Sequence, residues 1–186
     1  MKKVLRHGYT TGACATAAAR GAALMIARQE LVSEVSIELP TGAAVTFQLQ
    51  GQTFSKTSAA CFVVKDAGDD PDVTNGAELH AAVALTPARS QEKEQRILIT
   101  GGTGIGRVTK PGLAVAPGEW AINPVPRRMI EEAVQDVFPN GLLRVEISIP
   151  DGEARARKTL NARLGIIGGL SILGTTGIVR PISAKA

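Results

Sequence analysis

Four aspartates stand close together in the segment KDAGDDPDVTNG, residues 65–76. They are Asp66, Asp69, Asp70 and Asp72. Clustered carboxylates raise one another's pKa, so such a group can accept a proton or hydrogen-bond the ring nitrogens or hydroxyls of a ligand. A solvated turn explains the same composition, because Asp, Pro, Asn and Gly all suit turn geometry. The residues alone leave both interpretations open.

The acidic segment does not match a calcium-binding loop of the EF-hand type. In the register that begins at Asp70, the sixth position is Asn75, where a glycine is needed. The twelfth position is Ala81, where a bidentate glutamate is needed. Cys14 and Cys61 have no metal-binding spacing, and we interpret them as buried reduced thiols. The sequence therefore predicts no protein metal site.

A second candidate site is the segment ILITGGTGIG, residues 97–106, an apolar run that breaks into four glycines. A dinucleotide-binding loop needs glycines at its first, third and sixth positions, followed by a helix. Starting at Gly102, the sixth position is Arg107, and Pro111 follows too soon for that helix. We therefore expect a glycine backbone that lies against some other ligand, with a tight crossing of two strands as the alternative.

A basic group surrounds the proline-rich connection that follows. Its members are Lys110, Arg127 and Arg128. Arginine binds carboxylates through two parallel hydrogen bonds, so a ligand with several carboxylates would explain these residues. A solvated helix start is the alternative, although such a start favours acidic side chains over paired arginines.

Composition narrows the class of protein. The chain has 186 residues, of which 44% are hydrophobic but only 3% aromatic, so small and β-branched side chains must build its core. A net charge of +4 without a Lys/Arg cluster interleaved with aromatic residues does not indicate nucleic-acid binding. The uncharged, glycine-rich run over residues 164–179 is shorter than a membrane span of about 20 residues. We expect a cytoplasmic protein that binds neither membranes nor nucleic acid.

The sequence pattern predicts the helices and strands that position these segments. The alanine-rich residues 12–29 predict a helix capped by Thr10 or Thr11, and residues 124–138 predict another. The predicted strands are a hairpin over 35–49 and single strands over 61–66, 96–100 and 142–150. Residues 77–88 could form a strand or a helix, and we favour a strand because the segment ends in a β-branched stretch bounded by proline. Because helices and strands do not alternate, we predict one α+β domain over residues 1–186, not a Rossmann fold. We expect a mixed sheet with hairpins, two main helices, and glycine-rich loops at the ends of strands.

Four long motifs together resemble the CbiD family, the cobalt-precorrin-5B C1-methyltransferases of anaerobic cobalamin (vitamin B12) biosynthesis. The motifs are GYTTGACATAAARGAA, VVKDAGDDPDVTNGAE, ITGGTGIGRVTKPGLAVAPGEWAINPVPRRMI and LNARLGIIGGLSILGTTGIVRP, which span residues 8–181. The resemblance implies transfer of a methyl group from S-adenosylmethionine to ring carbon C1 of a cobalt-containing tetrapyrrole, giving cobalt-precorrin-6A. A non-catalytic, tetrapyrrole-binding half of that enzyme is the alternative.

The resemblance also selects candidate site residues. As catalytic residues we expect Asp69, Asp70 and Asp72. The residues expected to bind the tetrapyrrole stand in the matching motifs; they are Thr10, Thr11, Gly12, Asp66, Thr74, Asn75, Gly101, Gly102, Thr103, Gly104, Gly106, Lys110, Asn123 and Arg127. Methyl transfer from a sulfonium mostly requires alignment of two bound reactants, so we expect positioning to dominate over proton transfer.

Members of the family continue past the motif SILGTTGIVRP into a second α/β half. The resemblance implies that half as the natural place for the S-adenosylmethionine site. Because this sequence stops at Ala186, we expect the N-terminal portion of such an enzyme, with little or no methyl transfer by itself. Whether the chain forms a homo-oligomer is left open.

Overall fold

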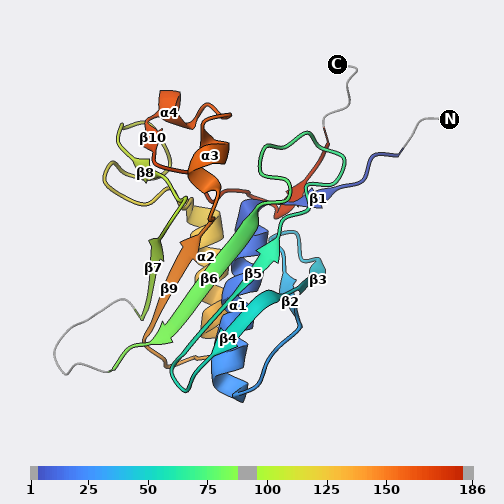
Figure 1. The fold of residues 1–186 in the computed structure, drawn as a ribbon, viewed down its shortest axis with the longest axis vertical. Coiled ribbons are helices and arrows are strands. Elements are labelled where there is room, and N and C mark those ends of the chain that lie inside the picture. The colour runs from blue at the N-terminus through green and yellow to red at the C-terminus, as the bar shows by residue number, and fades with distance from the viewer. Residues whose placement is uncertain (1–3, 88–95, 182–186) are drawn as a thin grey trace.

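The structure is a computed structural model, and it describes residues 4–87 and 96–181. Its centre is a five-stranded sheet (Figure 1). In order across the sheet, the strands are β4 (Gln50–Phe54), β5 (Ser58–Val64), β6 (Glu78–Leu85), β9 (Leu143–Ser148) and β7 (Ile97–Gly101). Neighbouring strands are antiparallel except β9 and β7, which run parallel. The sheet is therefore mixed, as predicted.

Two long helices, α1 (Thr11–Arg28) and α2 (Pro124–Gln135), pack against each other on one face of this sheet (Figure 1). Most residues of α1 are buried, because its alanines allow the sheet, α2 and a hairpin to approach from different sides. At Gly21, a Cβ atom would lie 2.4 Å from the Leu49 side chain. Small residues are thus what lets α1 occupy the centre of the molecule.

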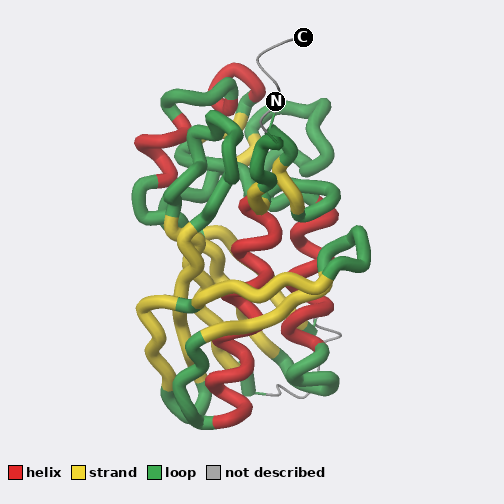
Figure 2. The backbone as a smooth tube through the Cα atoms, turned by 90° about the vertical axis from the view of Figure 1, so that its right-hand side faces the viewer, coloured by secondary structure: helices red, strands yellow, loops and turns green. Residues whose placement is uncertain are grey.

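The hairpin is formed by β2 (Glu34–Glu38) and β3 (Ala44–Gln48), and it lies in front of the helices in Figure 2. On the central strands, alternate side chains point toward the helices and are buried, such as Cys61 and Val63 on β5. Together with α1 they form the main hydrophobic core.

Short elements gather at the end of the sheet where β6 begins and β9 ends (Figure 1). Two short strand pairs lie there: β1 (Gly8–Tyr9) with β11 (Ile178–Val179), and β8 (Arg107–Val108) with β10 (Ile166–Ile167). Two short helices accompany them, α3 (Gly152–Ala156) and α4 (Asn161–Leu164). This end brings the first and last described segments of the chain side by side.

The α+β fold, the hairpin over 35–49 and both main helices are confirmed. The strand predicted over 77–88 extends from Glu78 to Leu85, and its last residue lies outside the described part of the chain. Strand β4 and the short helices α3 and α4 were not predicted. Strand β4 contains two glutamines and a glycine, a composition that resembles a loop.

Candidate functional site

A pocket of about 190 Å³ lies at the first turn of α1, at the end of the sheet where the short elements gather. Three segments that are far apart in the sequence meet there: the start of α1, the acidic segment and the last glycine-rich run. Polar residues that line it are Thr10, Thr11, Lys65, Asp72, Thr74, Thr159, Asn161 and Ser171. Four of these, Thr10, Thr11, Asp72 and Thr74, are site residues that the sequence predicted. The fold thus joins three of the four motifs in one cavity.

A buried ion pair between Lys65 and Asp72 forms part of the pocket wall. The Lys65 side chain is only 1% exposed, and its Nζ donates to Asp72 Oδ2 over 2.8 Å. The other carboxylate oxygen of Asp72 accepts hydrogen bonds of 2.7 Å from both the backbone N–H and the hydroxyl of Thr74. The carboxylate is therefore fixed in position, and it holds the lysine ammonium at the pocket.

Several hydrogen bonds tie the start of α1 to the last glycine-rich run. Thr11 Oγ1 accepts from the Leu173 N–H over 3.0 Å and donates to the Ser171 carbonyl over 3.3 Å, and the Gly12 N–H donates to the Leu173 carbonyl over 3.0 Å. Thr10 is the N-cap, because its Oγ1 accepts from the Ala13 N–H. The positive end of the helix dipole consequently faces the pocket that contains Lys65.

The environment of the ion pair shifts two pKa values. Partial burial raises the pKa of Asp72, but the hydrogen bonds from Lys65 and Thr74 outweigh it, so the net shift is downward. Burial raises the pKa of the Cys14 thiol to about 12, although the charge of Lys65 acts in the opposite direction. Asp72 is thus held as a carboxylate and Cys14 as a neutral thiol.

The lowered pKa of Asp72 predicts a loss of stability in acid. A carboxylate whose pKa is lower in the folded state stabilises the protein above its unfolded pKa of about 3.9. That contribution is lost as the pH falls through the lower, folded pKa. We expect Asp72→Asn to be less stable than wild type at pH 6, with the difference shrinking as the pH falls below about 4. Urea unfolding at several pH values measures this difference.

Asp66→Asn is the matched control. The pKa of Asp66 is also lowered, chiefly by a hydrogen bond from Arg6, but both side chains are at least half exposed. Such a pair contributes little to stability. A pH-independent difference between wild type and Asp72→Asn would show that the Lys65–Asp72 pair does not stabilise the fold.

Two other aspartates of the acidic segment, Asp66 and Asp69, contact Arg6 near the N-terminus. Asp66 pairs with the Arg6 guanidinium, and Asp69 Oδ2 accepts from the Arg6 N–H over 2.8 Å. Asn75 Oδ1 accepts from the Ala67 N–H and so closes the loop. Of the three aspartates predicted as catalytic, the structure brings Asp72 to the pocket, and Asp69 and Asp70 are not among its lining residues.

The glycines of the central loop are packed closely against other segments of the chain. At Gly104, whose φ is +76°, a Cβ atom would lie 1.8 Å from the Ile149 carbonyl oxygen. At Gly102 it would meet the Glu146 side chain, at Gly101 the Trp120 ring, and at Gly106 the Ile166 side chain. Thr103 accepts the Ile149 N–H through its carbonyl. Close packing of chain segments therefore accounts for these glycines, and ligand contact by this loop stays a prediction.

The three members of the predicted basic group point to different places. The Arg127 guanidinium donates to the Ile99 carbonyl on β7 over 3.3 Å, and the stem of Lys110 lies against Gly165. Arg128 lines a separate groove between α1 and α2. Asn123, the N-cap residue of α2, makes no side-chain capping bond. The carboxylate-binding role of this group also stays a prediction.

Lys65 is the residue that the sequence interpretation missed, although its position contained a signal. It follows Cys61 and Val63 at a spacing of two, so it continues the buried face of β5 beyond the strand's end. A lysine whose position in the alternating pattern points into the core is rare unless its ammonium is paired with an acidic group. Asn161 and Ser171 gave no comparable signal, because their place in the pocket depends on the path of the described chain after β9.

Two further predictions concern metals and membranes. Over residues 4–87 and 96–181, no cluster of His, Cys, Asp and Glu could hold a metal ion. In the same ranges, no helix is long and apolar enough to cross a membrane. Cys14 and Cys61 are both buried and unpaired, as predicted.

Comparison with known proteins identifies the family. The sequence model of the CbiD family matches residues 1–181. A cobalt-precorrin-5B C(1)-methyltransferase from Pelobacter propionicus is 70% identical over 182 residues, which cover 98% of this chain and 46% of the relative. The enzyme of the same name from Priestia megaterium is 50% identical, with 99% of this chain and 50% of the relative covered. The chain spans about half the length of the curated relatives it matches.

A solved structure gives the same result. The 1.9 Å crystal structure of the cobalamin biosynthesis protein CbiD from Archaeoglobus fulgidus superposes with a TM-score of 0.68 at 35% sequence identity. The match covers 96% of this chain and 55% of that protein. Motifs, fold and sequence comparisons agree, and the chain belongs to the CbiD family.

Proposed function

We propose that this chain, as one α+β domain, binds the tetrapyrrole in the S-adenosylmethionine-dependent methylation of cobalt-precorrin-5B at ring carbon C1. The product is cobalt-precorrin-6A, in anaerobic cobalamin biosynthesis in the cytoplasm. The names of the relatives support the reaction. The pocket that contains Lys65 supports a role in binding the substrate, because cobalt-precorrins bear acetate and propionate arms.

The observation that carries the proposal is a buried ammonium group at a polar pocket. An ammonium has three hydrogen-bond donors, and Asp72 accepts one of them. The first turn of α1 adds the positive end of a helix dipole, and threonine hydroxyls surround the same space. A carboxylate is the ligand group that this combination favours.

The size of the pocket limits what it holds. Sites that enclose a whole drug-sized ligand have volumes of roughly 300–1,000 Å³. At about 190 Å³, this pocket is suited to one carboxylate arm, with the macrocycle lying outside it. The cobalt would arrive already chelated by the macrocycle, as part of the substrate.

Asp72 then acts as a positioning residue. A general base works best when its pKa is near the working pH, whereas the pKa of Asp72 is lowered. Its contacts with Lys65 and Thr74 instead orient the ammonium toward the pocket. In this proposal the protein aligns the ring carbon, which supplies the electron pair of the new C–C bond. When bound, S-adenosylmethionine supplies the methyl group, and its sulfur keeps the electron pair of the broken bond.

Absorbance titrations with two soluble corrinoids test the proposal. Cobyrinic acid has free carboxylate arms, whereas cobinamide has amidated arms of similar shape. We expect saturable binding of cobyrinic acid and at least tenfold weaker binding of cobinamide, because an amide lacks the charge that pairs with Lys65. Equal affinity for the two, or no binding of cobyrinic acid, would contradict the proposal. The alternative, a non-catalytic tetrapyrrole-binding module, differs only in giving no methyl transfer.

A further inference from the structure

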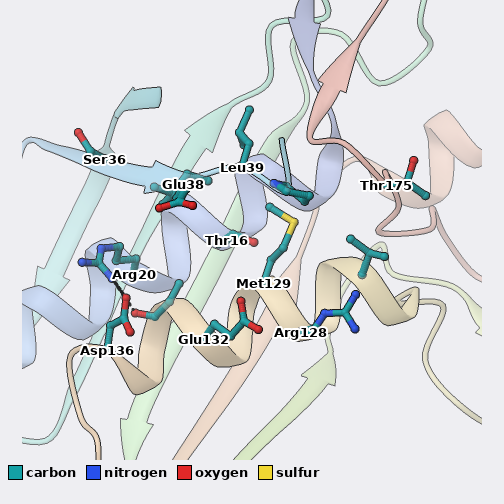
Figure 3. Close-up of a pocket in the computed structure, with 14 residues that line it drawn as sticks. Thr16, Arg20, Ser36, Glu38, Leu39, Arg128, Met129, Glu132, Asp136 and Thr175 are labelled. Carbon is teal, nitrogen blue, oxygen red and sulfur yellow. Dashed lines mark hydrogen bonds and ion pairs between the residues drawn. The ribbon is translucent and has the colours of Figure 1, made fainter. Parts of the chain in front are cut away.

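A larger groove of about 650 Å³ lies between α1, α2 and β2, apart from the pocket that contains Lys65 (Figure 3). Its size falls within the usual range for small-molecule sites. Thr16, Met129 and Leu39 lie along its middle, and charged side chains surround them. The proposed binding of the tetrapyrrole arm makes no use of this groove.

Some charged side chains of the groove form ion pairs, and others do not. Arg20 donates to Asp136 Oδ2 over 3.3 Å and to the Ala133 carbonyl over 3.1 Å, so it joins α1 to α2. Glu38 from β2 and Glu132 from α2 project into the groove from opposite walls (Figure 3). Within the described part of the chain, neither glutamate forms an ion pair. Two facing carboxylates favour a cation between them.

Arg128 gives the groove a positive group as well. It lies beyond Glu132, on the side away from the Arg20–Asp136 pair (Figure 3). Within the described residues Arg128 also forms no ion pair. A ligand that carries a cation in its middle and a carboxylate at one end would match both features. The apolar side chains of Leu39, Val125 and Met129 offer contact to an uncharged remainder.

The groove and the pocket lie on either side of one short segment. Leu173 lines the pocket and Thr175 lines the groove, while Gly174 between them is packed against Thr10. Helix α1 also borders both cavities, through Thr11 at the pocket and Thr16 at the groove. Transfer between two bound molecules requires their reacting atoms to come within about 3–3.5 Å. Sites separated by a single segment can serve a macrocycle that extends beyond its own pocket.

We propose that this groove binds S-adenosylmethionine, with the sulfonium between Glu38 and Glu132 and the amino-acid carboxylate at Arg128. The inference rests on the proposed function, from which it takes the methyl donor. It places the donor on this chain, whereas the family resemblance alone pointed to the second half of longer members. The three carboxylates and two guanidinium groups of the groove complement the net positive charge of the donor.

Calorimetric titration with S-adenosylmethionine and S-adenosylhomocysteine tests the inference. The two compounds differ by the methyl group and by the positive charge on sulfur. We expect tighter binding of S-adenosylmethionine. The double variant Glu38→Gln/Glu132→Gln should bind S-adenosylmethionine at least tenfold more weakly, with a smaller change for S-adenosylhomocysteine. Glu34→Gln, on the same strand but outside the groove, is the matched control and should bind both compounds as wild type does.

Absence of S-adenosylmethionine binding, or equal affinity in wild type and the double variant, would overturn the inference. Titration of the same variants with cobyrinic acid separates this failure from that of the proposed function. If wild type binds cobyrinic acid but not S-adenosylmethionine, the donor groove is refuted and the substrate pocket is retained. If wild type binds S-adenosylmethionine through the two glutamates but not cobyrinic acid, the donor groove is supported and the substrate pocket is refuted.

Discussion

Lys65→Ala is expected to lower the free energy of unfolding by about 3 kcal/mol, because it leaves the Asp72 carboxylate without its buried partner. The lower end of the range for broken buried pairs applies, since the Asp72 side chain is 25% exposed and water can reach it. The removed lysine stem also leaves a cavity beside the core. Urea unfolding at pH 7 measures the change. A loss below about 1 kcal/mol would mean that the pair behaves as a surface ion pair.

The double variant Lys65→Met/Asp72→Leu is the matched control for that prediction. It replaces both charges by apolar side chains of similar volume, so no buried charge is left unpaired. Such replacements are often neutral or stabilising. We expect this variant to be within about 1 kcal/mol of wild type. A double variant as unstable as Lys65→Ala would show that packing, and not the unpaired charge, causes the loss.

Gly104→Ala is expected to destabilise the protein by about 4 kcal/mol or more. The added Cβ atom would lie 1.8 Å from the Ile149 carbonyl oxygen and 3.0 Å from the Gly152 Cα atom, so backbone would have to move. The positive φ of +76° adds strain for any residue with a side chain. Thermal unfolding should show a large drop in the melting temperature, or the variant should fail to accumulate as folded protein.

Gly118→Ala separates the steric contact from the backbone strain. Gly118 has a φ of +90°, but no atom lies within 4 Å of the position that its Cβ would take. We expect a cost of about 1–2 kcal/mol, from the left-handed conformation alone. Similar losses for Gly104→Ala and Gly118→Ala would contradict the close crossing of the central loop with the residues that follow β9.

Local signals made part of the fold predictable from the sequence. The alanine-rich run with a threonine cap predicted α1. Alternation of apolar and polar residues on both sides of a Pro-Thr-Gly turn predicted the β2–β3 hairpin. The order of the sheet and the parallel pairing of β7 with β9 depend on contacts between distant segments. No local pattern encodes such contacts. Strand β4 was missed because pairing with β5, and not its own composition, stabilises it.

The candidate site was predictable in the same limited sense. The motifs identified the acidic segment and the start of α1. They did not indicate that Leu173, some 160 residues away, would form a hydrogen bond with Thr11. The central glycine loop was interpreted as a ligand contact because sequence does not reveal which backbone lies beside a glycine. In the structure, Ile149 and Gly152 fill the space beside Gly104. Lys65 was missed because its burial depends on the register of β5 continuing past the strand's end.

Calorimetric titration of wild type and of Lys65→Met/Asp72→Leu with cobyrinic acid tests the central claim most directly. The double variant is expected to keep the fold and to lose only the charges at the pocket. If the Lys65 ammonium binds a carboxylate arm of the tetrapyrrole, cobyrinic acid should bind the double variant at least tenfold more weakly than wild type. Equal affinities in two equally stable proteins would contradict the claim and place the tetrapyrrole elsewhere on the molecule.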